Sequence, residues 1–287
     1  MTTKIAFVTG ATGFTGSHLV RSLLGRGWQV RALARSTSDR SRLAGLVDRY
    51  GGSLTWIEGD LSQTAALLAG TTGATWVFHT AAYVELGLVD ADRMAQVNIQ
   101  GTANVLAAAK AAGVDRLIYC STIGVLGDTQ GRIVDETFQR QQVGFDSPYD
   151  RTKYEAQVLV DRAAAAGLPV ISVLPSGIFG GDDPHFGPVL RTFVAGKLKL
   201  WAGGDRITGI VHVDDLVEGM ILAAERGHIG AWYILSAGDL STRAMFSHLG
   251  QACGQAVPTE VPEGLVRWVG NLLDPIGRFL NWQPPLS

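Results

Sequence analysis

Short apolar segments alternate with longer Ala- and Leu-rich segments through the first 175 residues of the chain. The short segments are almost continuously hydrophobic, which is typical of strands covered by helices on both faces. The longer segments, residues 94–112 and 149–166, favour helix and end before Gly113 and Gly167. This alternation predicts an α/β fold with repeated βαβ units and a doubly wound parallel sheet. The expected strands are residues 5–9, 30–34, 54–58, 76–80, 116–120 and 170–174.

The pattern loosens after Pro175 into a Gly- and Pro-rich stretch, SGIFGGDDPHFGP, and one more strand is expected at residues 232–235. We therefore divide the chain into a sheet domain and a smaller C-terminal substrate-binding region. The predicted sheet domain is residues 1–175 with a later strand near 211–237, and the predicted substrate-binding region is residues 176–210 and 238–287.

The last part of the chain has helical spacing at residues 265–280, interrupted by Pro275, and we expect it to pack on the substrate-binding region. The final residues, PPLS, resemble the approach to a helix with Ser287 as its cap. This predicts that the chain is truncated at its C-terminus.

Composition and charge narrow the function classes. Hydrophobic residues make up 46% and charged residues 17%, which fits a folded globular chain of 287 residues. A net charge of −2 offers no basic stripe for nucleic acid and no patch for anionic lipid. Cys120 and Cys253 lie far apart, which argues against structural zinc and favours a reducing cytosol. No secretory signal or membrane span is readable, so we expect a cytoplasmic protein without a metal site.

Gly10, Gly13 and Gly16 form a GxxGxxG motif in VTGATGFTG. The spacing alone is weak, because the chain has 36 glycines. Its position is informative, since it follows the first strand and opens the first helix. There, bare backbone lets a pyrophosphate approach the unpaired N–H groups of the helix, which predicts a Rossmann dinucleotide site.

The end of the second strand indicates which dinucleotide binds. NAD sites usually carry an acidic residue here for the ribose 2′-hydroxyl, whereas this chain has Arg35 and Ser36 and no acid before Asp39. The pair would attract a 2′-phosphate, so we predict NADP rather than NAD, although Arg35 could also be a solvated surface charge. Asp60 after the third strand could accept from the adenine amino group or cap a helix.

Tyr149 and Lys153 are spaced i, i+4, so on a helix they project from one face. A free phenol is a poor base at neutral pH, and we expect the Lys153 ammonium and a positive nicotinamide to lower the pKa of Tyr149. Tyr149 would then exchange a proton with a carbonyl oxygen as hydride moves. Ser121 and Thr122 end the fifth strand; either could bind that oxygen, and one is expected to act as a cap.

The chain resembles an extended short-chain dehydrogenase/reductase, in the group of dihydroflavonol-4-reductase-like and NAD-dependent epimerase/dehydratase proteins. The resemblance covers nearly the whole chain and is specific. Its motifs are TGATGFTG at 9–16, GDL at 59–61, HTAA at 79–82, NIQGTANVL at 98–106, CSTIGVLG at 120–127, PYDRTK at 148–153, LPSGIFG at 174–180 and VHVDDL at 211–216.

The resemblance implies a catalytic set of Thr122, Tyr149 and Lys153, with Thr122 rather than Ser121 identified by counting back from Gly127. It implies that Asn98 orders the active-site helix, while His79 is expected to be a buried, satisfied histidine. The expected cofactor residues are Gly10, Thr12, Gly13, Phe14, Thr15, Gly16, Arg35, Ser36, Asp60, Leu61, Thr80, Ala81, Ala82, Asn98, Tyr149, Lys153, Pro175, Gly177 and Ile178. The expected substrate residues are Tyr83, Thr122, Tyr149 and Ser176.

Three reactions or roles compete. A reductase of an apolar ketone or aldehyde needs only the catalytic set, whereas a nucleotide-sugar epimerase also binds a diphosphate. Sugar epimerases of this family usually carry an arginine where this chain has Thr208, with Arg206 nearby, and dehydratases carry an acidic pair where it has Ile123 and Gly124. A non-catalytic dinucleotide sensor on the same fold is the third reading.

The pocket is expected among residues 83–88, 176–186 and the segment around Trp201, although these residues could instead be core. The resemblance also implies a homodimer through the helices near 94–112 and 149–166.

Overall fold

The computed structural model describes residues 4–84, 89–262 and 264. These residues form two compact units. The first unit consists of residues 4–84, 90–176 and 212–235, and the second of residue 89 with residues 177–211, 236–262 and 264. The expected helix at 265–280 and the expected truncation lie outside the described residues.

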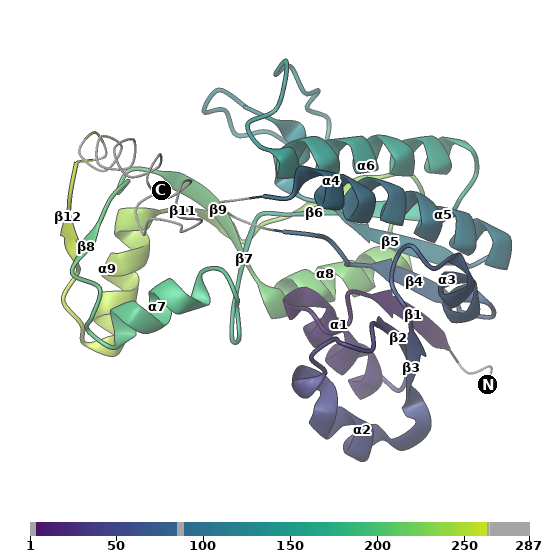
Figure 1. The fold of residues 1–287 in the computed structure, drawn as a ribbon. Helices are drawn as coiled ribbons and strands as arrows, with labels where there is room; N and C mark the ends of the chain where they lie inside the picture. The colour runs from purple at the N-terminus through teal and green to yellow at the C-terminus, as the bar shows by residue number, and fades with distance from the viewer. Residues whose placement is uncertain (1–3, 85–88, 263, 265–287) are drawn as a thin grey trace. The chain divides into compact units, whose positions relative to one another are not determined.

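A seven-stranded parallel sheet in the order β10-β6-β5-β4-β1-β2-β3 forms the centre of the first unit (Figure 1). Its order reverses between β1 and β4, which is the switch point where open α/β sheets bind ligands. The predicted fold class is thereby confirmed, and every expected strand is present within one residue at each end. The strands are β1 (Ile5–Thr9), β2 (Gln29–Ala34), β3 (Leu54–Glu58), β4 (Trp76–His79), β5 (Arg116–Cys120), β6 (Val170–Pro175) and β10 (Trp232–Leu235).

Helices cover both faces of this sheet (Figure 1). Helices α3, α5 and α6 pack beside one another on one face, and α1 packs beside α8 on the other. Phe7, Leu67, Val105 and Leu117 are fully buried between the sheet and the first group, which is why both sides of each strand are apolar. The helices of the first unit are α1 (Phe14–Gly25), α2 (Ala44–Tyr50), α3 (Thr64–Thr71), α4 (Ala91–Ala95), α5 (Gly101–Ala112), α6 (Pro148–Ala165) and α8 (Val213–Arg226).

The two long helices follow from local signals. A π-helical turn, Gln96–Gln100, joins α4 to α5, so one continuous helical path runs to the left-handed cap at Gly113, φ +63°. Helix α6 begins at Pro148, and the hydroxyl of Ser147 caps it by accepting from the backbone N–H of Asp150 at 3.1 Å.

The second unit has less regular structure and its own small core. Its sheets pair β11 (Gly238–Ser241), β9 (Ile207–His212) and β7 (Gly177–Phe179), and separately β12 (Thr259–Glu260) and β8 (Leu200–Trp201). Phe193 of α7 (Gly187–Val194), Trp201 and Phe246 of α9 (Thr242–Cys253) form the core. Trp201 Nε1 donates to the carbonyl of Pro258 at 2.7 Å, so Trp201 is a core residue, as the alternative reading of the sequence allowed.

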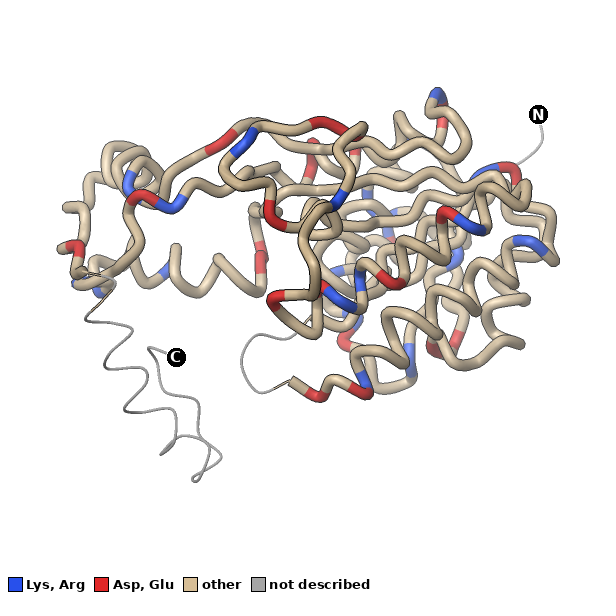
Figure 2. The backbone as a smooth tube through the Cα atoms, turned by 90° about the horizontal axis from the view of Figure 1, so that it is seen from above, with Lys and Arg blue, Asp and Glu red and all other residues tan. Residues whose placement is uncertain are grey.

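Charge is spread over both units. Figure 2 shows acidic and basic positions interspersed along the chain, in keeping with the small net charge. Among the helices of the described residues, none is long and apolar enough to cross a membrane.

Candidate active site and cofactor site

Gly10 and Gly16, in the glycine loop after β1, have no room for a side chain. Gly10 has φ +71°, and a Cβ there would lie 2.7 Å from the backbone nitrogen of Ala81. A Cβ on Gly16 would lie 2.1 Å from the carbonyl oxygen of Gly10, and that carbonyl accepts from Gly13 N–H at 2.9 Å. The loop is therefore packed backbone against backbone, which brings bare peptide groups to the end of β1.

Helix α1 begins at this loop with its N-terminal N–H groups uncapped by a side chain. Gly13 is the N-cap residue with an extended backbone, and the first turn contains no acidic residue. Thr12 precedes the cap, and Phe14 and Thr15 form the first turn. These N–H groups need an acceptor, and the positive end of the helix favours an anion. The loop and helix start thus fit the pyrophosphate of a dinucleotide.

The end of β2 carries more positive charge than the sequence reading identified. Arg35 and Ser36 are exposed directly after the strand. The guanidinium of Arg40 lies over the ring of Trp56 at 4.5 Å, and that of Arg42 lies 6.0 Å from the ring of Phe14. Sequence reasoning missed Arg40 and Arg42, although the repeated arginines in ARSTSDRSR were a usable signal.

Asp60 forms a local turn and does not cap a helix. Its carboxylate accepts from the backbone N–H of Ser62 at 2.8 Å and from the Ser62 hydroxyl at 2.6 Å, whereas the N-cap of α3 is Gln63. These hydrogen bonds, with a smaller contribution from Arg35, lower the pKa of Asp60 below its ordinary value. Leu61 is buried, with its carbonyl accepting from Asn104 at 2.8 Å.

The segment after β4 is held from two sides. Thr80 Oγ1 donates to the carbonyl of Thr9 at 2.7 Å, which ties the segment to the end of β1. Asn98 accepts from Tyr83 N–H at 2.7 Å, and its amide donates to the carbonyl of Tyr83 and to Thr152 Oγ1 on α6, both at 3.1 Å. Asn98 therefore links the post-β4 segment to the helix that carries Tyr149, as the resemblance implied.

Lys153 on α6 is buried, with 2% of its surface exposed, and points toward the end of β5. Its Nζ donates to the hydroxyl of Tyr119 at 3.0 Å and to the carbonyl of Cys120 at 2.9 Å. An ammonium has three N–H bonds, so these two acceptors leave one for a further partner.

Tyr149 is half-buried one turn before Lys153 on α6. The expected lowering of its pKa is wrong for the protein alone. Burial raises the pKa of Tyr149, because a phenolate is poorly solvated there, and the Lys153 ammonium only partly opposes this effect. Sequence spacing identified the opposing charge but could not measure the burial.

Thr122 has the capping role expected for one of the two hydroxyls after β5. Its Oγ1 accepts from Gly124 N–H at 3.2 Å at the start of a short 3-10 helix, Ile123–Leu126. Its own O–H remains a donor. Ser121 Oγ is buried and has no hydrogen-bond partner within the described residues.

His79 is buried and satisfied, as expected. Its Nδ1 lies 2.8 Å from Thr9 Oγ1 and its Nε2 lies 3.0 Å from Thr102 Oγ1. Burial and the positive charge of Lys153 lower the pKa of His79 to about 3, so the ring is neutral at physiological pH.

The remaining expected residues fall into both units. Pro175 ends β6, and Ser176 Oγ follows it and donates to the carbonyl of Leu235 at 3.4 Å. Gly177 and Ile178 belong to β7 of the second unit. A Cβ on Gly177 would lie 3.1 Å from the carbonyl of Gly209 on β9, so this glycine allows close strand packing.

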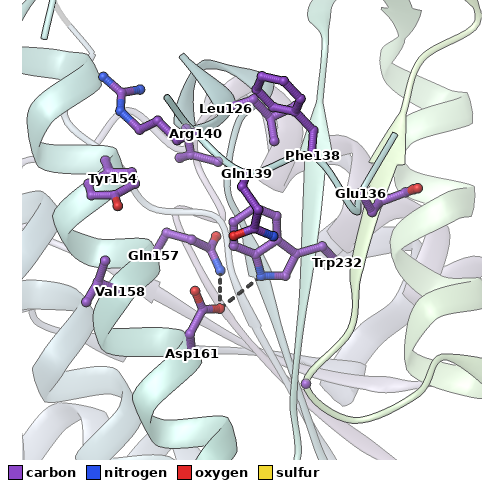
Figure 3. Close-up of a pocket in the computed structure, with 12 residues that line it drawn as sticks. Leu126, Glu136, Phe138, Gln139, Arg140, Tyr154, Gln157, Val158, Asp161 and Trp232 are labelled. Carbon is purple, nitrogen blue, oxygen red and sulfur yellow. Dashed lines mark hydrogen bonds between the residues drawn. The ribbon is translucent and has the colours of Figure 1, made fainter. Parts of the chain in front are cut away.

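A separate cavity of about 440 Å³ lies along another face of α6 (Figure 3). Tyr154, Val158 and Asp161 line it from the helix, and Trp232 of β10 lines it from the sheet. Asp161 accepts from Gln157 at 2.8 Å and from Trp232 Nε1 at 2.9 Å, as the dashed lines show. Tyr149 and Lys153 are not among its lining residues.

Comparison with known proteins identifies the family. Residues 6–234 match the NAD dependent epimerase/dehydratase family, and the chain belongs to it. The chain is 34% identical to a putative dihydroflavonol 4-reductase of Synechocystis sp., covering 95% of this chain and 80% of that protein. It is 36% identical to a 4-hydroxy-2-methyl-3-oxo-4-farnesyl-3,4-dihydroquinoline-1-oxide ketoreductase of Stigmatella aurantiaca, over 81% of this chain and 68% of that protein.

Solved structures agree on the fold. The chain matches DesIV, a dTDP-glucose 4,6-dehydratase of Streptomyces venezuelae with NAD and TYD bound, with a TM-score of 0.79 and 25% identity. The match covers 90% of this chain and 84% of that one. The protein is therefore an NAD(P)-dependent oxidoreductase of the extended short-chain dehydrogenase/reductase type, and its relatives include named reductases and dehydrogenases.

Proposed function

We propose that this protein reduces a ketone or aldehyde with NADPH and that Tyr149 donates the proton to the carbonyl oxygen. The observation that carries the proposal is the placement of Tyr149 and buried Lys153 one turn apart on α6, with Lys153 anchored at the end of β5. The nicotinamide would supply the hydride.

The protonation of Tyr149 suits the reductive direction. Because burial raises its pKa, the phenol keeps its proton at neutral pH and can donate it. Lys153 stabilises the phenolate left after donation through its positive charge. Thr122 keeps an O–H that can hold the same carbonyl oxygen, since its Oγ1 only accepts from Gly124 N–H.

The preference for NADP rests on the arginines after β2. Arg35, Arg40 and Arg42 cluster in sequence where a 2′-phosphate would bind, and Arg40 is steadied by the Trp56 ring. Asp39, the nearest acid, has its carboxylate engaged by the backbone N–H of Ser41 at 2.9 Å. A ribose 2′-hydroxyl would find no carboxylate acceptor among residues 35–38.

The proposed substrate is an apolar carbonyl compound. The relatives named as a ketoreductase and as a 2-alkyl-3-oxoalkanoate reductase support a carbonyl substrate. Tyr83 and Ser176 are the proposed substrate contacts beyond Thr122 and Tyr149.

A nucleotide-sugar epimerase is less well supported, although the fold is shared. Thr208, in β9, offers no positive charge to a diphosphate. A non-catalytic sensor is also less well supported, because Thr122, Tyr149 and Lys153 are all retained. The homodimer through α5 and α6 and the cytoplasmic location stay predictions.

The test mixes the protein with NADPH and a panel of aromatic and aliphatic ketones and follows nicotinamide absorbance. We expect Tyr149→Phe to lower turnover by about 10²- to 10⁴-fold, the range for losing a positioned proton donor. The affinity for NADPH, measured by fluorescence, should change little.

Tyr154→Phe is the matched control, because Tyr154 lies on the same helix but lines the separate cavity. Its turnover should equal that of the wild type. Full activity in Tyr149→Phe would contradict the proposed mechanism.

A further inference from the structure

Lys153 is held by a residue that the proposed chemistry does not use. Tyr119, the penultimate residue of β5, accepts from Lys153 Nζ at 3.0 Å, and the ammonium lies 4.5 Å from the centre of its ring. Tyr119 is 1% exposed, so water does not compete for this contact. Burial raises the pKa of the Tyr119 hydroxyl, and a weaker contribution from the side chain of Thr102 on α5 opposes this effect.

Hydrogen bonds connect Thr102 to the strand that carries the glycine loop. His79 Nε2 lies 3.0 Å from Thr102 Oγ1, and His79 Nδ1 lies 2.8 Å from Thr9 Oγ1. Thr9 is the last residue of β1, and its hydroxyl also accepts from Ala81 N–H at 3.4 Å. A buried network thus runs from Thr102 through His79 to the start of the glycine loop.

The hydrogen bonds of Thr102 fix the tautomer of His79. Thr102 Oγ1 donates its single proton to the carbonyl of Asn98 at 2.6 Å, so its oxygen accepts from His79 Nε2. His79 Nδ1 then accepts from the Thr9 hydroxyl. Lys153 can only donate, so the Tyr119 oxygen accepts from it.

These hydrogen bonds should persist at neutral pH, because neither Tyr119 nor His79 changes its charge there. Burial raises the pKa of Tyr119 above its ordinary value, so it stays a neutral phenol. Burial likewise lowers the pKa of His79 to about 3.

We propose that Tyr119 is a positioning residue, whose hydroxyl fixes the Lys153 ammonium beside Tyr149 with one N–H left for the cofactor. This inference rests on the proposed function. Tyr119 acts through Lys153 and contacts neither the carbonyl nor the hydride.

Burial raises the pKa of Tyr149, and the Lys153 ammonium opposes this effect. The charged and titratable groups that act on Tyr149 are Lys153 and Asp150 on α6, and Cys120 and Tyr119 on β5. Of these, only Lys153 lowers the pKa of Tyr149. Loss of the Tyr119 hydroxyl frees the ammonium to move, so the pKa of Tyr149 should rise.

The experiment uses Tyr119→Phe in the full chain, with Tyr154→Phe as the matched control on α6. In Tyr119→Phe, the dissociation constant for NADPH, measured by fluorescence without substrate, should rise by about three- to tenfold. The acidic limb of the pH profile for alcohol oxidation with NADP⁺, along which activity rises as Tyr149 ionises, should move up by about 0.5 to 1 pH unit. Tyr154→Phe should change neither quantity.

A second pair of variants keeps the inference testable if Tyr119→Phe does not fold. Thr102→Val removes the hydroxyl that lowers the pKa of Tyr119, whereas Thr102→Ser keeps it. We expect the pH shift in Thr102→Val and its recovery in Thr102→Ser, with folding checked by thermal unfolding.

Wild-type NADPH affinity and pH profile in folded Tyr119→Phe, or equal profiles in the two Thr102 variants, would overturn the positioning role. Different results would contradict the proposed function: the wild-type protein would not bind NADPH, or Tyr149→Phe would keep full turnover.

Discussion

The two ends of the candidate site hold their positive charges in opposite ways. Lys153, at the chemical end, is 2% exposed and bound by Tyr119 and the carbonyl of Cys120. Arg35, at the adenosine end, is exposed, and its hydrogen bonds to Ser38 run through its backbone. The buried charge depends on hydrogen-bond geometry, whereas the exposed charge depends on electrostatic attraction that salt screens.

The two ends should therefore respond differently to substitution. At the chemical end a single lost hydroxyl should alter proton transfer, because nothing in the buried site replaces it. At the adenosine end, water and neighbouring arginines can compensate for the loss of one charge. A single substitution there should mainly alter the preference for NADP over NAD. The loop between the two ends should be the most sensitive part, since Gly10 and Gly16 have no room for a Cβ.

Gly16→Ala tests the loop and should have the largest effect on cofactor binding. The new Cβ would meet the carbonyl oxygen of Gly10 at 2.1 Å, so the loop must move and lose its fit to the pyrophosphate. We expect NADPH to bind about 100-fold more weakly, which corresponds to about 3 kcal/mol. Titration by fluorescence measures this loss.

Gly25→Ala is the control in the same helix, because its Cβ would meet only the Tyr50 hydroxyl at 3.8 Å. It should bind NADPH normally. Wild-type affinity in Gly16→Ala would show that the loop does not approach the cofactor.

Arg35→Ala tests the adenosine end. Loss of this charge should weaken NADPH binding by about tenfold and leave NADH binding nearly unchanged, because only NADPH carries the 2′-phosphate. Added salt should reduce the difference between wild type and variant. Dissociation constants for both cofactors at two salt concentrations measure the effect.

Arg49→Ala is the control, since Arg49 is an exposed arginine on α2 that lies over the Tyr50 ring. If Arg35→Ala weakened NADH and NADPH equally, Arg35 would not recognise the 2′-phosphate.

The buried network also predicts an effect on stability at acid pH, which leaves cofactor binding at neutral pH unchanged. The pKa of His79 is about 3 in the folded protein and 6.5 when unfolded, so the unfolded state takes up the proton first as pH falls. The free energy of unfolding should therefore fall below pH 6.5 and continue falling toward pH 3. This single group can contribute at most about 1.4 kcal/mol per pH unit.

His79→Gln should flatten this part of the stability curve, measured by urea unfolding between pH 7 and pH 4. His248→Gln changes an exposed histidine and should leave the curve as in the wild type. Identical slopes for His79→Gln and wild type would mean that His79 is not held neutral.

Much of the fold and part of the site could be predicted because their signals are local. Continuous apolar segments identified the strands, and the order of strand, glycines and helix located the loop at Gly10. The spacing of Tyr149 and Lys153 placed both on one helix. Arg40 and Arg42 were missed, because their stacking on Trp56 and Phe14 joins residues that are distant in the sequence.

The parallel sheet, the glycine loop, Arg35 after β2 and the pairing of Tyr149 with Lys153 could all be predicted from the sequence. Each depends on residue type and on spacing within one or two turns or a single strand. The tertiary structure was needed to show that burial raises the pKa of Tyr149, that Trp201 is core, and that Tyr119 holds Lys153. Burial and hydrogen bonding depend on neighbours brought together from separate strands and helices, and the residue types alone do not specify those neighbours.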